Sequence, residues 1–463
     1  MEFTIKQSVL REELGFVAGI VERKSTIPVL SNILIESIGE KEIRIVGTDL
    51  DVTIRCDAEA EIKQPGAMCV QARKLFELVR LLDGGDVNFR KEDNEWVTMK
   101  TGRSSFRLAG VSREQFPEVP AFKSVPMRLS ADVFNHFIQN TSFAITNEQS
   151  RFTLSGAKFE LTADAARMVT TDGHRLAFIE KKLDGSETVG TMDALIPKKA
   201  LMELVKIARE AGGDVSFGED PNHIYFEVEG RLLITRKLSG NFPNYEMVLP
   251  KDNDKIAEFD LEEMRAAVRR VSLMADERTR SIRLFIREGE IEITGQSSEE
   301  GEGREFVPAD YTGDEVQIGF NAAYLQDFLN VVSGAVAEAG ASEMSSGIRG
   351  SGSEVHLSSG SAADARGPSD TVPTIARGVE ADADSDAVSG SEGSARASEG
   401  ANMAGSTGSA SVRETDGDKV RVRETASRPR IQFEFKDGNA QTQMRLAGDT
   451  TYDYKYIVMP LRI

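Results

Sequence analysis

Asp172 and His174 are the two side chains whose types and spacing most suggest acid–base chemistry. They lie two residues apart in TDGHRLA, residues 171–177, so on a strand they would share one face. An imidazole beside a carboxylate can act as a general base. No nucleophile motif accompanies them, and the sequence contains no HExxH, GxSxG, Walker A or dinucleotide-binding glycine motif. We therefore expect no catalytic residue and no enzymatic activity. Asp172-Gly173 is alternatively an ordinary turn pair.

Cysteines are too few for a structural framework of disulfides or of zinc. The chain has two, Cys56 and Cys69, which excludes a four-cysteine metal site. The N-terminus lacks the basic stretch and apolar run of a secretory signal. No apolar run approaches the ~18–20 residues that cross a membrane. We expect a cytoplasmic protein with no metal and no cofactor.

Basic side chains are placed on the predicted helices, although the net charge of the chain is −19. That total alone argues against nucleic-acid binding, because phosphate affinity needs Lys and Arg. Summed together, the six predicted helices nevertheless carry a small positive net charge. They cover residues 6–24, 71–82, 132–140, 198–211, 261–272 and 322–332. Acidic residues are therefore concentrated outside the helices.

The same charge pattern recurs on separate helices. Arg73, Glu77 and Arg80 follow an i, i+4, i+7 spacing opposite buried leucines, and 126 residues later the same places are taken by Lys199, Glu203 and Lys206. A third helix has a similar polar face, formed by Glu262, Arg265, Arg269 and Arg270. One such face is most often plain solvated surface. If the units that carry these helices close into a ring with the helices inward, the repeated faces line one hole.

The elements that carry these residues form an internal repeat. The apolar positions Leu75, Leu78, Val79 and Leu82 recur as Leu201, Leu204, Val205 and Ala208. In both copies a glycine pair, an Asp-Val-x-Phe strand and later a Phe-Pro turn follow. Helices also begin near Ser8, Ala131 and Leu261. We predict three copies of one α+β unit, each with two helices packed on antiparallel sheets.

The third copy is interrupted after its second helix, which carries Leu325, Phe328, Leu329 and Val332 before Gly334. Residues 333–427 contain no aromatic residue, and 50 of these 95 are Gly, Ser or Ala. Such a stretch cannot bury enough apolar surface to offset its ordering entropy. We predict a disordered insertion, either a tolerated surface loop or a regulatory tail. The domains are then 1–125, 126–250 and 251–463.

At this point the sequence resembles the β subunit of bacterial DNA polymerase III, a sliding clamp. The resemblance rests on the three units, on TDGHRLA and on the C-terminal VMPLRI at 458–463. GTDLDV at 47–52, FPNY at 242–245 and GFNAAYL at 319–325 agree with it. It implies a head-to-tail ring homodimer that encircles duplex DNA, slides without sequence specificity and makes DNA replication processive. The clamp loader, the polymerase III catalytic subunit and repair proteins are the implied partners.

The resemblance also implies the site residues. Candidates for contact with DNA phosphates are Lys24, Arg73, Arg80, Lys198, Lys199 and Lys206. Across the dimer interface, Phe106 and Leu108 are expected to meet Leu273 and Met274. A pocket for short partner peptides is expected from Leu154, Thr171, Gly173, His174, Arg175, Leu176, Pro243, Met247, Val248, Asn321, Tyr324, Ile457, Val458, Met459, Pro460, Leu461 and Arg462.

Two positions depart from the expected pattern of that pocket. Met247 stands where a basic residue is common, and Thr279 stands where a larger apolar residue can occur. An alternative function keeps the fold but makes the chain a clamp paralogue with a resistance or repair role.

Overall fold

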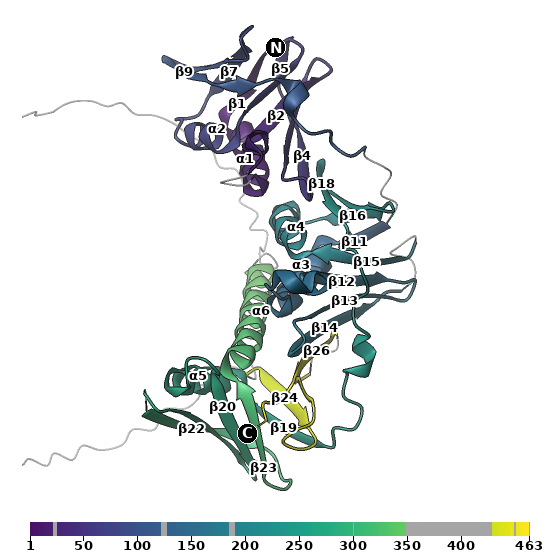
Figure 1. The fold of residues 1–463 in the computed structure, drawn as a ribbon, viewed down its shortest axis with the longest axis vertical. Coiled ribbons are helices and arrows are strands. Elements are labelled where there is room, and N and C mark those ends of the chain that lie inside the picture. Colours follow the sequence, from purple (N-terminus) through teal and green to yellow (C-terminus); the bar gives the residue numbers. More distant parts are fainter. Residues whose placement is uncertain are drawn as a thin grey trace, which may run out of the picture. The chain divides into compact units, whose positions relative to one another are not determined.

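The computed structural model describes residues 1–21, 26–121, 127–184, 190–299, 301–348, 428–448 and 451–462 (Figure 1). Lys24, residues 349–427 of the predicted insertion and Ile463 lie outside the described residues. Among the described residues, no helix is both long and apolar enough to cross a bilayer.

Six α-helices of the described chain form three pairs, in the order that the repeat predicts. Their bounds are α1 Gln7–Ile20, α2 Ala72–Arg80, α3 Ala131–Thr141, α4 Lys198–Ala211, α5 Leu261–Val271 and α6 Ala322–Ile348. Each presents one apolar face to the core: Leu75 and Val79 of α2 and Leu201 and Leu204 of α4 are fully buried. The predicted apolar spacing is therefore that of the buried helix faces.

Strands make up most of the remaining regular structure. In the first copy they are β1 Glu2–Lys6, β2 Asn32–Ile38, β3 Glu42–Thr48, β4 Val52–Glu59, β5 Glu61–Gln64, β6 Ala67–Gln71, β7 Asp86–Lys91, β8 Val97–Thr101, β9 Ser104–Leu108 and β10 Gly110–Val111. In the second they are β11 Met127–Ser130, β12 Gly156–Leu161, β13 Ala165–Thr171, β14 Arg175–Lys182, β15 Met192–Pro197, β16 Asp214–Glu219, β17 His223–Val228 and β18 Arg231–Arg236. In the third they are β19 Lys255–Asp260, β20 Ser281–Arg287, β21 Glu290–Ser297, β22 Gly301–Asp310, β23 Val316–Asn321, β24 Arg430–Phe435, β25 Thr442–Leu446 and β26 Asp453–Val458.

The strand pairing repeats in all three copies. The strand before the first helix of each copy pairs antiparallel with the strand after its second helix: β1 with β7, β11 with β16, and β19 with β24. In the third copy the interruption lies in sequence between the two paired strands, because β19 precedes it and β24 begins only at Arg430. The three-copy α+β architecture is confirmed.

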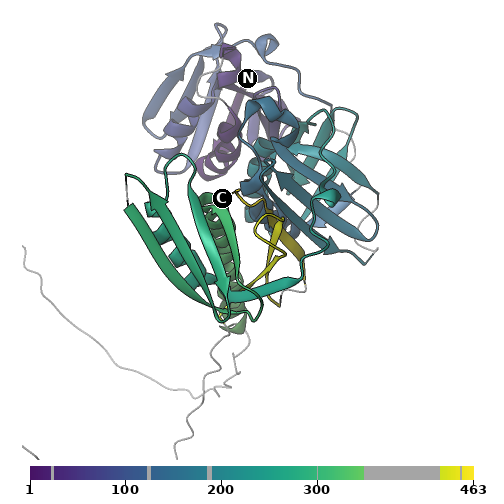
Figure 2. The same cartoon turned by 60° about the horizontal axis from the view of Figure 1, so that its bottom comes forward.

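Two sheets continue from one copy into the next. β4 of the first copy pairs with β18 of the second, and β14 of the second pairs with β26 of the third (Figure 1); the yellow strands of the third copy lie beside the teal sheet of the second in Figure 2. Backbone hydrogen bonds of a sheet ladder therefore cross both boundaries. This fixes which side chains of neighbouring copies can meet.

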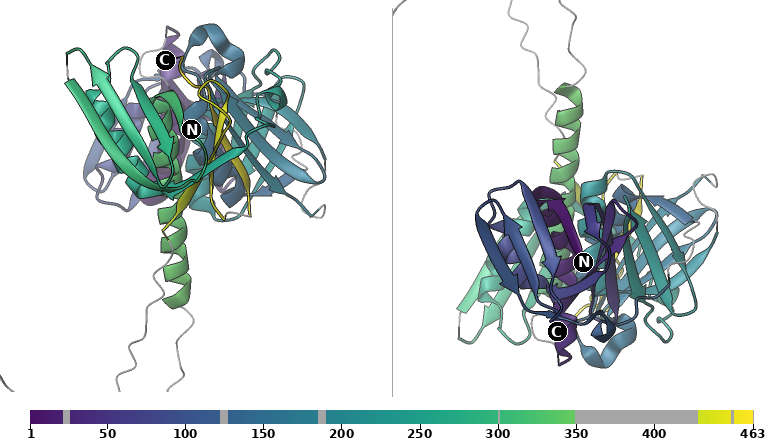
Figure 3. Two further views of the ribbon diagram at one scale, coloured as in Figure 1. Left: turned by 90° about the horizontal axis from the view of Figure 1, so that it is seen from below. Right: turned by 90° about the horizontal axis from the view of Figure 1, so that it is seen from above.

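The prediction that a glycine ends the second helix of each copy is confirmed in one copy only. Gly212 caps α4 with a left-handed φ of 60°. Helix α2 instead ends at Arg80, before the Gly84-Gly85 pair. Helix α6 runs through Gly334 to Ile348 as one unbroken helix (Figure 3), so the prediction that it ends at Gly334 is wrong, and so is the disorder predicted for 333–348. An Ala-rich stretch continues a helix easily, because Ala has the highest helix propensity.

Candidate functional site

The segment TDGHR is a tight turn between β13 and β14. The Asp172 carboxylate accepts hydrogen bonds from the backbone N–H groups of His174 (3.0 Å) and Arg175 (3.1 Å), and from Arg175 Nε (3.1 Å). Gly173 has a φ of +90°, which glycine adopts without strain. The carboxylate of Asp172 therefore holds the turn, and the geometry favours the turn interpretation over a catalytic pair.

This turn forms one wall of a small apolar cavity of about 110 Å³. Ten of the predicted pocket residues line it: Leu154, Thr171, Gly173, His174, Arg175, Leu176, Pro243, Val248, Ile457 and Met459. They come from the second copy, from the connector between 237 and 254 and from the third copy. Side chains of this kind in a concave arrangement suit an apolar anchor of a ligand.

The floor of the cavity is the ladder between β14 and β26. Leu176 lies opposite Ile457 in that ladder, and the Met459 N–H donates to the carbonyl oxygen of His174 at 2.9 Å. Leu176 and Ile457 pack in one buried cluster with Val169, Phe178 and Tyr245. The cavity thus depends on the junction of two copies.

Tyr245 lines the cavity, although the sequence analysis did not name it as a site residue. Its hydroxyl donates to Glu160 Oε2 at 2.6 Å. Burial, and then this hydrogen bond, raise the pKa of Tyr245. Its place between Pro243 and Val248 was the signal that could have identified it.

The other predicted pocket residues lie outside the cavity lining. Met247 is 78 % exposed. Asn321 accepts a hydrogen bond from the Ala323 N–H at the start of α6 (3.0 Å), and the Tyr324 ring lies 6.3 Å from the His174 ring. Val458 is buried in the core. The chain then continues through Pro460, Leu461 and Arg462, and the Leu461 N–H donates to Gly319 O at 2.8 Å.

The cations predicted to contact DNA have different surroundings. Arg73 and Arg80 are exposed on α2. Lys199 Nζ instead forms an ion pair with Asp49 and donates to Ile20 O (3.2 Å), so it joins α4 to the first copy. Lys206 Nζ pairs with Glu203 at 2.7 Å. Not all the predicted cations are therefore equally available to a phosphate.

Lys198 lies close to the charges of Arg175 and Asp327. Its Nζ donates to Asn147 Oδ1 at 3.1 Å. Burial, and then the charge of Arg175, lower the pKa of Lys198. Its neighbourhood is thus the turn and junction around Arg175.

A hollow of about 580 Å³ between α1, α2 and α4 collects further basic groups. Arg80 and Lys206 line it together with Arg11, which the sequence analysis did not single out. Only the contact of α1 with α2 and α4 places Arg11 beside them.

The four predicted interface residues lie at or beside incompletely paired strands. Phe106 and Leu108 belong to β9, which ends its sheet. Leu273, 70 % exposed, and Met274 lie in the 3₁₀ turn η6 (Ser272–Met274), which packs near β22. Within the described ladders, residues 301–308 of β22 pair on one side only, with β21, and Phe306 there is 51 % exposed.

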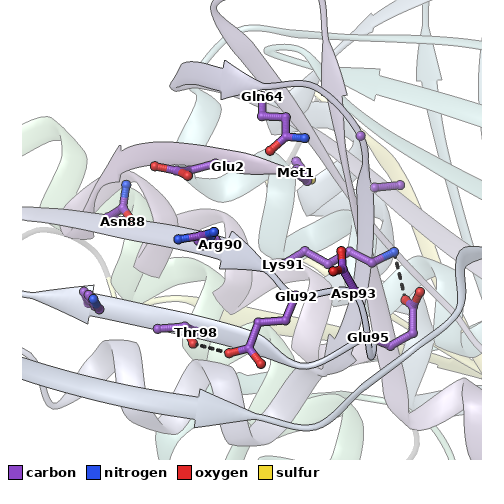
Figure 4. A pocket seen from close by; sticks show the side chains of 13 residues that line it. Met1, Glu2, Gln64, Asn88, Arg90, Lys91, Glu92, Asp93, Glu95 and Thr98 are labelled. Atoms are coloured by element: carbon purple, nitrogen blue, oxygen red, sulfur yellow. Dashed lines mark hydrogen bonds and ion pairs between the residues drawn. The ribbon is translucent and has the colours of Figure 1, made fainter.

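A hollow of about 1010 Å³ lies on the first copy, and no predicted site residue lines it. Two pairs of its polar groups interact with each other: Lys91 pairs with Glu95 at 2.8 Å, and Thr98 donates to Glu92 at 2.8 Å (Figure 4). Compared with the apolar cavity beside Leu176, it offers no apolar anchor site.

The sequence matches the DNA polymerase III beta subunit in three consecutive stretches. The N-terminal domain of that subunit matches residues 1–120, the central domain 128–244 and the C-terminal domain 246–347. This chain belongs to the DNA polymerase III beta subunit family.

Relatives of this beta subunit chain that are named beta sliding clamps align with it over most of their length. The beta sliding clamp of Pseudomonas putida is 35% identical over 336 residues, which cover 72% of this chain and 90% of that protein. The beta sliding clamp of Caulobacter vibrioides is 35% identical over 346 residues, 73% of this chain and 92% of the relative.

Solved beta subunit structures share the fold. The DNA polymerase III subunit beta of Pseudomonas aeruginosa superposes with a TM-score of 0.74 at 25% identity, covering 100% of both chains. A sliding clamp of the same species bound to griselimycin gives a TM-score of 0.74 at 26% identity, again with 100% of both chains covered.

Proposed function

We propose that this beta subunit chain is the processivity clamp of its replicative polymerase: a head-to-tail homodimer that encircles duplex DNA and slides along it. Membership of the DNA polymerase III beta subunit family, whose relatives are named beta sliding clamps, supports this function. The observation that carries it is the threefold recurrence of one α+β copy along the whole chain.

The domains that we propose are 1–125, 126–250 and 251–463, with residues 333–427 inserted in the third. The family matches over 1–120, 128–244 and 246–347 support the first two boundaries, and the third match extends into the first part of the proposed insertion. The first part of the insertion extends α6 as far as Ile348.

Ring closure is proposed to join β9 of one protomer to β22 of the other. Within the described ladders, β9 and residues 301–308 of β22 each have backbone groups without a partner along one edge, which favour addition of a further strand. Phe106 and Leu108 would then pack against the exposed Leu273 and Met274 of the partner. A heterologous contact of this kind closes into a ring when its rotation permits.

Topological enclosure removes the conflict between holding DNA and moving along it. Weak phosphate contacts from exposed cations are compatible with sliding, because they carry no sequence information. Arg73, Arg80 and Arg11 are the candidates whose surroundings best suit this role. Lys24 stays a candidate from sequence alone.

The apolar cavity beside Leu176 is proposed to receive short peptides of the clamp loader, of the polymerase III catalytic subunit and of repair proteins. A small apolar anchor site can carry most of the energy of such an interface. The chain itself is proposed to have no catalytic activity and to work in the cytoplasm, where a bacterial chromosome is replicated. No observation favours the alternative role of a resistance or repair paralogue.

The test is retention on DNA of different topology. Native mass spectrometry should give a dimer, and clamp loaded on a primed circle should stay bound through gel filtration. Linearising the circle should release it, because an enclosing ring slides off a free end. A protein that stays equally bound after linearisation, or that is a monomer at replication concentrations, would contradict the proposal.

A further inference from the structure

Arg175 is the most heavily partnered cation at the junction of the second and third copies. Its Nη1 donates to Asp327 Oδ2 of α6 at 2.6 Å, and its Nη2 donates to Phe143 O at 2.8 Å. Its Nε donates to Asp172 Oδ2 at 3.1 Å. The guanidinium also lies 4.6 Å from the ring centre of Tyr324. Three segments of the chain therefore converge on one side chain.

Arg175 contributes to the cavity lining, but its guanidinium binds groups on α6 and at Phe143 rather than the apolar floor. Leu176, its neighbour on β14, lines that floor together with Ile457. Successive side chains of a strand point to opposite faces, so the Arg175 side chain leaves the sheet on the other side. There it meets α6 and the carbonyl oxygen of Phe143.

We propose that Asp327 is a positioning residue of the peptide cavity: it holds Arg175, and Arg175 in turn fixes the 171–175 turn that forms the cavity wall. This inference rests on the proposed peptide-binding function of the cavity. It makes the shape of a wall built from the second copy depend on a helix of the third.

The physical reason is the cost of leaving a buried cation short of partners. The Arg175 side chain is only 9 % exposed, whereas Asp327 is 43 % exposed. Without the Asp327 carboxylate, the guanidinium keeps one carboxylate, Asp172, and is drawn toward solvent or toward a new acceptor. Asp172 also holds the N–H groups of His174 and Arg175, so any movement of Arg175 is passed directly to the turn.

The test compares two single substitutions in the full chain. Asp327→Asn removes the negative charge that pairs with Arg175. The control, Asp57→Asn, removes the charge from a comparable pair in the first copy, in which Arg44 donates to Asp57 at 2.8 Å and 2.9 Å. The probe is a fluorescein-labelled octapeptide with a central Leu-Leu pair among serines, read by fluorescence anisotropy. We expect Asp327→Asn to weaken binding about tenfold or more, and Asp57→Asn to leave it unchanged.

Hydrogen exchange separates positioning from general destabilisation. In Asp327→Asn, the amides of Gly173 and His174 should exchange faster, because they donate within the turn to Thr171 Oγ1 and Asp172 Oδ1. Amides of the β20–β21 ladder in the third copy should keep their rates. Asp327→Glu, which retains the charge, should recover part of the affinity.

The outcomes are distinct. If wild-type protein does not bind the probe, but exchange in the turn still responds to Asp327→Asn, the peptide-binding function is contradicted and the positioning role of Asp327 is retained. If wild type binds and Asp327→Asn binds equally well with unchanged exchange, the positioning role is overturned and the peptide function is kept. Uniformly faster exchange across the third copy would also overturn it.

Discussion

Single side chains in this protein take roles that their helix position does not reveal. Lys199 and Arg73 occupy matching places on repeated helices, yet Lys199 is bound to Asp49 and Ile20 O, whereas Arg73 is exposed. The Asp49 side chain is 6 % exposed. Lys199 is therefore mainly a link between the first and second copies, and Arg73 is the better candidate for a phosphate contact.

Lys199→Ala should lower the free energy of unfolding by about 1–3 kcal/mol, because it leaves the Asp49 carboxylate without its cation. Arg73→Ala should change it by less than about 0.5 kcal/mol, as exposed positions usually do. Urea unfolding followed by circular dichroism measures both. Equal effects of the two substitutions would contradict the distinct roles.

The double substitution of Arg73 and Arg80 to Glu should lower the amount of clamp that loads onto primed circular DNA without changing the urea midpoint. Two attractive charges become repulsive, so the loss should grow as salt is lowered. Gel filtration of loaded clamp at two salt concentrations gives the result. Loading equal to wild type at both would rule out α2 as a DNA contact.

The two thiols should be unreactive in the folded protein. Burial raises the pKa of Cys69 to about 11, and burial also raises that of Cys56. Because the raised pKa favours the neutral thiol, the stability that this burial contributes is present below pH 9 and is lost as pH rises through about 11. A thiol reagent at pH 8 should label both cysteines only in urea; rapid labelling of native protein would refute this.

At the scale of elements, edge strands and helix ends decide assembly. β9 and residues 301–308 of β22 each leave one edge without a partner in the described ladders. Long unpaired edges invite pairing with another chain unless they are protected. The apolar side chains of Leu273 and Phe306 are exposed beside this edge, which favours an edge that is covered in the assembly over one that is protected by charged residues.

Leu273→Asp combined with Phe306→Asp should destabilise the dimer by about 2 kcal/mol or more, since charges would be placed in an apolar contact. Leu81→Asp is the matched control, because Leu81 is 77 % exposed on the first copy. Sedimentation equilibrium should show dissociation for the double substitution only. A dimer dissociation constant equal to that of wild type would show that the interface lies elsewhere.

At the scale of the whole molecule, continuous ladders join the copies. β4 pairs with β18 and β14 pairs with β26, so neighbouring copies are joined by backbone hydrogen bonds as well as by side chains. Arg231 adds to the first junction, where it donates to Glu13 at 2.7 Å and 2.9 Å. Such joints suit a ring that must resist opening while it slides.

Replacing residues 349–427 by a flexible Gly-Ser linker should leave dimerisation and DNA retention within about twofold of wild type. The ladder between β19 and β24 is complete without these residues, and loop length adds little to the free energy of closure. Retention assays on circular DNA provide the measurement. Loss of the dimer in the shortened chain would assign these residues to the assembly.

The sequence by itself determined the number of copies and the buried helix faces, and its family resemblance implied most of the cavity wall. Apolar periodicity and turn residues are local properties, so Leu75, Leu201 and the Asp172-Gly173 turn could be identified without coordinates. Its helix ends were less certain, as α6 shows, because propensity alone does not fix where a helix stops.

Only the tertiary structure decided what each charged side chain does. Lys199 meets Asp49 across 150 residues, and Arg175 meets Asp327 across 152. A helical pattern states which face a cation occupies but not which distant carboxylate faces it. That choice depends on how the copies are joined, and the joining strands β4, β18, β14 and β26 are far apart in the chain.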